Sequence, residues 1–264
     1  MIRALAWRSV TSRKLRAALN GLGIVLGVRQ AVEAAHNYPY DVPNVSVDYL
    51  RQEIGINVGY WRSVSHALNC FVAESFMDEL AHAAKKDPFE FRRDLLGKQP
   101  RFKRVLEEAA AMAGWGKAPA GRHQGIALME GYGTYLAQVA EVSVTGGALK
   151  VHRVVCAVDC GQMVNPAIVE SQIESGIVFG LTAALWGEIT LDRGRVRETN
   201  FDRYRLMRLN EAPVIEVRLL ESREVPGGVG EPSTSVVAPA VCNAIFAATG
   251  RRLRELPIGK ALKT

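Results

Sequence analysis

A single carboxylate, Glu231, stands between a run of glycines and a proline in the stretch VPGGVGEPSTSVVAPA, which begins at Val225. Glycine lets the backbone adopt conformations, and approach other groups closely, in ways that a side chain would forbid. Pro232 fixes its own φ and favours an extended conformation at the residue before it. Glu231 is therefore either a solvated loop charge or a rigidly held carboxylate at a site where the Gly-rich backbone leaves room for a ligand. The local sequence leaves both interpretations open.

No pattern of metal-binding residues accompanies this carboxylate. The four cysteines form no CxxC pair, the five histidines form no HExxH motif, and no Walker phosphate loop occurs. Cys156 and Cys160 lie in the apolar, strand-like stretch VVCAVDCG. We therefore expect buried free thiols rather than disulfides, and no metal ion held by protein side chains.

The net charge of +6 belongs mainly to one end of the chain. Residues 1–28 contain five basic residues and no acidic one, which leaves 28 basic and 27 acidic residues in the rest. A nearly neutral body argues against a nucleic-acid-binding surface. With 264 residues, 48% of them hydrophobic, the chain is long enough for one large domain or two small ones with a sizeable core.

Residues 1–28 form a basic, amphipathic start that runs into an apolar stretch of 12 residues at 17–28. A membrane-spanning helix needs about 20 apolar residues. The arm resembles the N-terminus of ABC-transporter permeases of the lipoprotein-export and cell-division type. One hypothesis is a fusion or frameshift near residues 28–30, which makes the arm foreign to the domain at 29–264; the alternative is a native amphipathic surface helix with weak membrane association. Cytoplasmic and periplasmic locations both stay open.

Helices dominate the first half of the remaining chain. Apolar residues recur at helical spacing over 69–86, continue from residue 88 to 96, and recur over 101–113. Gly114 then closes the third helix at its C′ position. A strand is expected before them, at 45–52.

The second half changes to strand periodicity. Residues 135–144 alternate as a strand does, and a Gly-Gly turn at 146–147 leads into ALKVHRVVCAVDCG, which predicts a hairpin. Further strands are expected at 188–191, 195–199 and 215–220.

Two more helices complete the expected elements. Asn165 and Pro166 open a helix that runs to residue 186, and a last helix at 238–249 has Pro239 in its first turn and Gly250 just past its end. Helices and hairpins are interspersed without βαβ regularity. The sequence therefore predicts an α+β fold.

Five stretches of the chain carry a family resemblance together. They are GYWRSV at 59–64, NCFVAESFMDELAHAAKKDPFEFRRDLL at 69–96, VVCAVDCGQMVNPAIVESQIESGIVFGLTAALWGEIT at 154–190, NFDRYRLMRLNEAP at 200–213 and GGVGEPSTSVVAPAVCNAIFAATGRRLRELPI at 227–258. In this order they resemble the molybdenum hydroxylases of the xanthine dehydrogenase and aldehyde oxidase family. The likeness covers residues of about 30–258 and is greatest to the C-terminal part of β subunits of the isoquinoline 1-oxidoreductase type.

The resemblance implies a molybdenum ion held by the dithiolene of a pterin cofactor, of the molybdopterin cytosine dinucleotide type, with no protein ligand to the metal. In this family a metal hydroxo group attacks an electron-poor carbon of an N-heterocycle or aldehyde, and electrons leave through the pterin to iron–sulfur clusters. A carboxylate beside the metal takes the hydroxo proton. The family places this base in a GxGE motif, and GVGE ends here in Glu231.

Three further residues carry over from the resemblance as cofactor-binding residues. Gln172, in SQIESG, matches a Q-x-E-G stretch whose glutamine amide bonds the pterin or a molybdenum oxo group. Arg62 lies where the family has an arginine-bearing loop near the metal, and Gly230 precedes the base in the GxGE motif. The chain departs from the family at Ser175, where glycine is usual, so an added hydroxymethyl group would crowd the cofactor there. Without the resemblance, Gln172 is an ordinary helix-surface glutamine and Arg62 an exposed arginine beside Trp61.

Two segments that cradle the pterin in such subunits, one of the M-G-Q-G kind and one rich in Thr, Ser and Gly, do not occur in this sequence. Each buried polar group left without a partner costs about 1–3 kcal/mol. We therefore expect a truncated cofactor-binding domain that is inactive alone and does not retain the cofactor unaided. The expected partners are an iron–sulfur (2Fe–2S) small subunit and a complementary large-subunit segment that covers exposed core faces.

Two other functions are alternatives to this one. A folded remnant, or an assembly partner of an iron–sulfur subunit, would do no chemistry, and molybdenum content and turnover with the missing half added would distinguish it. A membrane protein is suggested only by residues 1–28, because nothing after Val28 offers about 18 consecutive apolar residues.

Overall fold

The computed structural model describes residues 35, 38–48, 50 and 59–262, so the expected N-terminal arm at 1–28 lies outside the described residues. The strand expected at 45–52 is wrong where it is described, because residues 45–48 and 50 are not in a strand. Val45 and Val47 are 55% and 42% exposed. β-Branched residues favour strands where neighbours pack against them, and these two side chains lack that packing.

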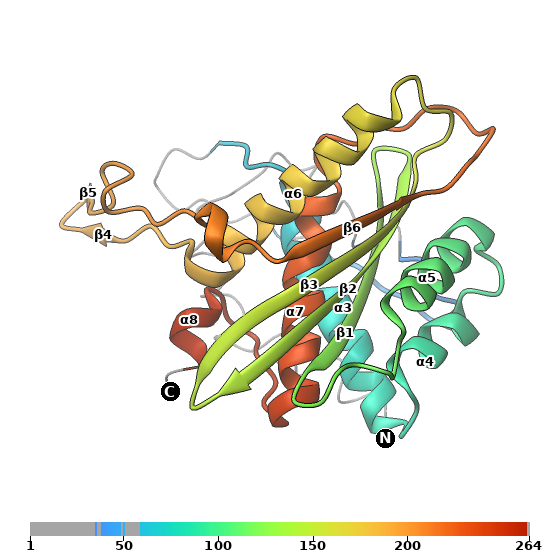
Figure 1. Ribbon diagram of the computed structural model, residues 1–264, viewed down its shortest axis with the longest axis horizontal. Coiled ribbons are helices and arrows are strands. Elements are labelled where there is room, and N and C mark those ends of the chain that lie inside the picture. Colours follow the sequence, from blue (N-terminus) through green and yellow to red (C-terminus); the bar gives the residue numbers. More distant parts are fainter. Residues whose placement is uncertain (1–34, 36–37, 49, 51–58, 263–264) are drawn as a thin grey trace.

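A four-stranded sheet in the order β1-β2-β3-β6 organises the molecule (Figure 1). Its strands are β1 (His123–Gly131), β2 (Thr134–Thr145), β3 (Ala148–Asp159) and β6 (Val214–Leu219). The expected hairpin of β2 and β3 is confirmed, and β1 pairs with the outer edge of β2 in antiparallel register. β1 was not expected from the sequence.

A parallel crossover joins the last two strands of this sheet. β3 pairs with β6 in parallel register, and the chain between them passes through helix α6 (Pro166–Trp186). Parallel neighbours need such a crossover, and this is the one parallel pairing among the described strands, which agrees with the expected lack of βαβ regularity. The strands expected at 188–191 and 195–199 shrink to a two-residue pair, β4 (Leu191–Asp192) and β5 (Arg195–Val196). The fold class remains α+β.

Helices cover both faces of the sheet. On one face α3 (Val64–Ala83), α6 and α7 (Ser233–Thr249) contribute to a hydrophobic cluster with the strands. On the other face α5 (Pro100–Ala113) packs against β2 and β3, beside α4 (Pro88–Leu95). The central strands are buried on both sides, which explains why their sequences read as nearly continuous apolar runs.

Two helix starts differ from the expectation. α3 begins at Val64 rather than near residue 69, and α7 begins at Ser233 rather than near residue 238. Pro239 therefore lies inside α7, not in its first turn. Serine and threonine at 233–235 are poor helix formers by themselves, but their burial against α6 and the sheet overrides that preference.

α3 ends at Ala83 rather than near residue 86, and the remaining expected helix ends are confirmed. Asn165 Oδ1 accepts from Ile168 N at the start of α6, and Asp87 Oδ1 accepts from Phe89 N and Glu90 N at the start of α4. Gly114, at φ 59°, ends α5. Two short helices complete the chain: a 3-10 helix, η1 (Leu209–Glu211), and α8 (Ile258–Ala261).

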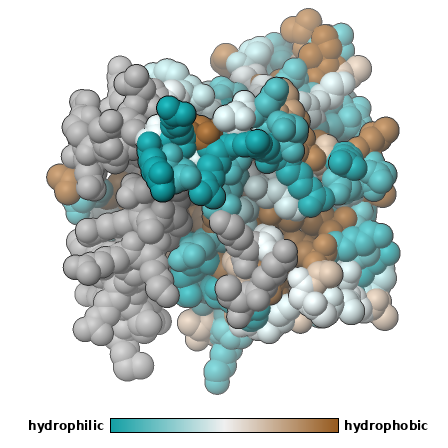
Figure 2. All heavy atoms as spheres, turned by 90° about the vertical axis from the view of Figure 1, so that its left-hand side faces the viewer, coloured by the Kyte–Doolittle hydropathy of each residue, from teal (hydrophilic) through white to brown (hydrophobic). Residues whose placement is uncertain are grey.

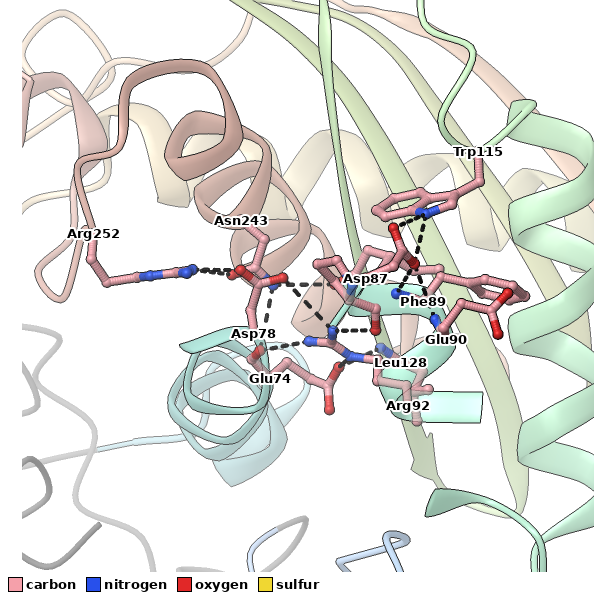
Figure 3. A network of polar contacts seen from close by, with 12 residues as sticks. Glu74, Asp78, Asp87, Phe89, Glu90, Arg92, Trp115, Leu128, Asn243 and Arg252 are labelled. Atoms are coloured by element: carbon pink, nitrogen blue, oxygen red, sulfur yellow. Dashed lines mark hydrogen bonds and ion pairs between the residues drawn. The ribbon is translucent and has the colours of Figure 1, made fainter. Parts of the chain in front are cut away.

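A buried ionic network fastens α3 to its neighbours (Figure 3). Arg92 of α4 is fully buried, and its Nε donates to Glu74 Oε2 at 2.9 Å. Glu74 also accepts from Leu128 N of β1, and Asp78 pairs with Arg252 at 2.7 Å. Every one of these charges has an opposite charge within the network, which is the condition for burying charge without a large penalty.

α6 is long and apolar enough, by length and composition, to cross a membrane, but 44% of its apolar window is buried inside the protein. A buried core helix passes the same test, so this is weak evidence for a span. All four cysteines, Cys70, Cys156, Cys160 and Cys242, are buried free thiols, as the sequence predicts.

Candidate functional site

Three segments that are far apart in the sequence meet at Arg62: its own, α6 and the loop at Gly230. Its Nε donates to Gly230 O at 2.7 Å, and its Nη1 donates to Ser175 Oγ at 3.0 Å. Its Nη2 donates to the main-chain oxygen and to Oε1 of Gln172 at 3.4 and 3.3 Å. Glu231 follows Gly230 directly. The structure therefore brings together all four residues that the sequence nominates for the site.

The Glu231 carboxylate is held from the loop that precedes α3. Ser63 N donates to Glu231 Oε1 at 2.9 Å. On the other side, Thr234 N donates to the main-chain oxygen of Glu231 at 3.1 Å as α7 begins. The carboxylate is half-buried, so it is both oriented and accessible.

Two consecutive residues of this loop have an unusual backbone. Ser63 has φ 78° and Val64 has φ 50°, in the left-handed region that non-glycine residues rarely adopt. For a β-branched residue such as Val64 this conformation costs of order 1–3 kcal/mol, and it persists only where the surroundings enforce it. Ser63 is fully buried, and its Oγ contacts Ser235 Oγ of α7. Sequence reasoning did not single out Ser63.

The glycines before Glu231 serve two purposes. A Cβ on Gly227 would lie 2.6 Å from the main-chain carbon of Gly133, and one on Gly228 would lie 3.2 Å from Tyr132 Cβ. These two glycines therefore let the loop pack against the β1–β2 turn. At Gly230 the only such neighbour among the described residues is Gln172 Oε1, at 3.8 Å. Of these three glycines, Gly230 thus has the most space beside it within the described part of the chain, where a ligand can approach the backbone.

Two glycines of α6 set the distance between the helix that carries Gln172 and the helix that follows Glu231. A Cβ on Gly180 would lie 2.5 Å from Thr234 O, and one on Gly176 would lie 2.0 Å from Ser233 Oγ. α6 and α7 therefore pack with their backbones close together. Ser233 Oγ and Thr234 Oγ1 are buried in this contact without a hydrogen-bond partner in the described part of the chain.

Aromatic contacts hold Arg62 from the outside. The Trp61 and Phe179 rings are 5.2 Å apart, and the Arg62 guanidinium lies 5.6 Å from the Phe179 ring. Partial burial lowers the pKa of Arg62, and the charge of Glu231 opposes that change. The positive charge of the Arg62 guanidinium is thus less fully balanced by negative charge than that of a buried arginine in an ion pair.

Ser175, where the chain departs from the family pattern, contacts another residue of the candidate site. Its side chain is exposed on α6, and its hydroxyl accepts from Arg62. The extra hydroxymethyl group therefore contributes a contact within the protein.

Sequence reasoning also missed His66, on the first turn of α3. Its ring is buried and lies 5.0 Å from the ring of Tyr132. Burial lowers the pKa of His66, while Ser63 and the charge of Glu231 oppose this change. A single histidine inside an expected helix carries no distinguishing signal in one sequence.

The residues around Gly230 offer hydrogen-bonding groups that fit a polar cofactor such as a pterin. No group of three or more His, Cys, Asp or Glu in the described part of the chain is placed to hold a metal ion. The open space at Gly230 borders the Gln172 amide, which accepts from Arg62 through Oε1 and so keeps its Nε2 hydrogens for another acceptor. A polar ring or oxo group fits there.

Comparison with known proteins places this chain in a family. A family model described as a molybdopterin cofactor-binding domain matches residues 68–213. This match covers more than half of the chain, and the chain belongs to the molybdenum hydroxylase family. The matched region contains Gln172 and Ser175, whereas Arg62, Gly230 and Glu231 lie outside it.

Relatives and solved structures agree with this placement. The chain is 36% identical over 229 residues to isoquinoline 1-oxidoreductase subunit beta of Brevundimonas diminuta, covering 84% of this chain and 29% of the relative. It is 33% identical over 253 residues to a membrane-bound aldehyde dehydrogenase (pyrroloquinoline-quinone) of Gluconacetobacter polyoxogenes, covering 86% and 33%. Quinoline 2-oxidoreductase from Pseudomonas putida 86 shares the fold at 14% identity with a TM-score of 0.68, over 76% of this chain and 52% of that one. The chain thus spans about a third of the length of these curated relatives.

Proposed function

We propose that this chain supplies the catalytic base and one wall of the cofactor site of a molybdenum hydroxylase that acts on N-heterocycles or aldehydes. The observation that carries the proposal is the convergence of Arg62, Gln172, Gly230 and Glu231, although Arg62 and Gly230, for example, lie 168 residues apart in sequence. The names of the relatives include both substrate classes, an isoquinoline and an aldehyde.

In this proposal Glu231 is the general base. Oε1 accepts the Ser63 N–H, and the described residues donate no other hydrogen bond to this carboxylate, so Oε2 is available to take a proton. The main-chain contact at Thr234 and the contact at Ser63 fix the direction in which Oε2 points. A base acts efficiently only when it is held within hydrogen-bond reach of the proton that it removes.

Gln172, Gly230 and Arg62 are proposed to contact the cofactor. Gln172 offers amide hydrogens, Gly230 offers an open backbone, and Arg62 keeps one of its five N–H donors, since four of its hydrogen bonds go to protein oxygens. When bound, a molybdenum–pterin cofactor of the cytosine dinucleotide type would supply the two-electron oxidation that inserts water-derived oxygen.

The proposed partners are an iron–sulfur small subunit that takes the electrons and a complementary large-subunit segment that completes the cofactor site. On the side that carries β4 and β5, a hydrophilic band crosses the described surface and apolar side chains lie exposed beside it (Figure 2). Exposed apolar groups gathered in this way favour contact with another protein surface. Over the described residues as a whole, the most exposed large apolar side chains are Val164, Leu209, Leu50 and Val225.

Metal and cofactor analysis of the purified chain is the first test of this function. We expect molybdenum and pterin in the complex that forms when the complementary segment and the small subunit are co-expressed in a host that makes the cofactor. Pyrroloquinoline quinone should be assayed in the same sample. Glu231→Gln should retain the cofactor and lose about 10²–10⁴-fold in turnover, the contribution typical of a general base.

Two results would contradict the proposal. A folded complex that lacks molybdenum would make the chain a non-catalytic assembly component, and a loaded complex in which Glu231→Gln turns over like the parent would remove Glu231 as the base. Gln162→Glu is a matched control. It exchanges an amide for a carboxylate at one exposed position, in a turn outside the site.

A further inference from the structure

Arg62 makes more hydrogen bonds to other protein residues than a residue that only binds a cofactor would need. Its guanidinium reaches the residue before the catalytic carboxylate at Gly230 O and reaches α6 at Gln172 and Ser175. Four acceptor oxygens from three residues on two separate segments fix a planar guanidinium in position and orientation, because its N–H donors have a rigid geometry.

We propose that Arg62 and Ser175 form a latch that fastens the Glu231 loop to α6, with Arg62 as a positioning residue for the base. The inference rests on the proposed function only for the role of Glu231. The latch itself is a property of this chain without cofactor.

Ser175 is essential to the latch because it is the acceptor for Arg62 Nη1. A hydrogen bond from a charged donor is roughly twice as strong as one between neutral groups. Glycine at 175 would leave that donor to water and would free the guanidinium to rotate. The departure of this chain from the family pattern thus coincides with a specific contact of the nearby arginine.

The latch also stabilises the unusual backbone of the next two residues. Ser63 and Val64 have positive φ, and in this conformation Ser63 N reaches Glu231 Oε1. Such strain persists where both sides of the segment are held. The side chain of Arg62 holds one side and α3 holds the other, so loss of the latch would let Ser63 N leave the carboxylate.

Hydrogen exchange at the Ser63 amide measures this directly in the full chain without cofactor. Ser175→Ala should speed its exchange by about tenfold, the equivalent of one charge-assisted hydrogen bond. Ser171→Ala is the matched control: Ser171 is exposed on α6 one turn earlier, and its hydroxyl donates to Ala167 O at 2.9 Å within the same helix. Both changes improve helix propensity equally. Ser175→Thr retains the hydroxyl and should exchange like the parent.

Equal exchange rates in Ser175→Ala and Ser171→Ala would overturn the latch. If Ser175→Ala fails to fold by circular dichroism, Arg62→Lys provides the second measurement, because lysine keeps the charge but cannot reach three acceptors in one plane; an unchanged Ser63 rate in that variant would also overturn the proposal. In the assembled enzyme, Ser175→Ala should lower kcat and leave KM unchanged. Loss of activity in Glu231→Gln tests the proposed function separately, since the exchange measurement needs neither cofactor nor turnover.

Discussion

Two arginines, Arg92 and Arg62, each join several segments of this protein, and the contrast between them separates stability from function. Arg92 is fully buried and binds Glu74 and Asp78. Burial alone would lower its pKa, but Glu74, Tyr40 and Asp78 outweigh burial and raise it. For Arg62 the balance is reversed, and burial lowers the pKa against the charge of Glu231.

The opposite directions have a physical meaning. A network that raises the pKa of its arginine supplies enough negative charge to balance the guanidinium. Such an arginine needs no ligand to balance its charge. The guanidinium of Arg62 is bound mostly by neutral oxygens, lies partly exposed and borders strained backbone. Incomplete compensation of this kind is typical of sites that take a ligand. The two networks should therefore respond differently to substitution.

The largest expected effect is in the buried network. Arg92→Met should destabilise the protein by about 3–5 kcal/mol, because it leaves the buried Glu74 carboxylate without its cationic partner and leaves Asp78 with Arg252 alone. Urea unfolding followed by circular dichroism measures this. The exposed pair of Lys86 and Asp94, 3.0 Å apart, is the control, and Lys86→Ala should cost less than about 1 kcal/mol. Similar losses in both variants would contradict the expectation that the buried ion pairs matter more for stability than the exposed one.

The next effect is at the contact of α6 and α7. Gly180→Ala should destabilise by about 1–3 kcal/mol, since the new methyl group would lie 2.5 Å from Thr234 O and 2.6 Å from Val237 Cγ1. Gly97→Ala meets no atom within 4 Å and serves as the control. Thermal unfolding compares the two, and a Gly180→Ala protein as stable as the parent would show that the helix spacing is adjustable.

The sequence predicted the individual site residues better than their arrangement. Gln172, Gly230 and Glu231 stand in short motifs, so they could be nominated one by one. Their meeting point depends on the crossover through α6 and on the close approach at Gly180, and neither follows from local patterns. The positions of Glu231 and Arg62 relative to each other are set by the tertiary structure.

The elements that were missed share a cause. β1 lacks alternation because Ile126 and Leu128 face one side of the sheet while Ala127 and Met129 face the other, all of them buried. A strand buried on both faces cannot be recognised by period. The start of α7 was missed because burial, not propensity, makes Ser233 helical.

A smaller, pH-dependent effect is expected at His66. Because its folded pKa lies below the unfolded value of about 6.5, the unfolded state binds the proton more readily, and stability is lost as the pH falls below that value. The slope cannot exceed about 1.4 kcal/mol per pH unit for one proton. His66→Asn should flatten this dependence of stability on pH, as measured by urea unfolding between pH 5 and pH 7.

The charge of Glu231 raises the pKa of His66. Glu231→Gln should therefore move the imidazole NMR titration to lower pH, and no movement would mean that the two groups are uncoupled.

The smallest effect tests the strained backbone by comparing the two ends of α3. At the C-terminal end Lys85 has φ 55°, its N donates to His82 O, and Lys86 N donates to Ala81 O, which is the Schellman arrangement that glycine favours. Lys85→Gly should therefore stabilise by about 0.5–1 kcal/mol. Ser63→Gly relieves the same kind of strain at the other end but also removes the contact with Ser235 Oγ, so it should gain less. Thermal unfolding of both variants decides this: an equal gain would mean that the Ser63 hydroxyl contributes nothing, and that only its N–H serves the carboxylate.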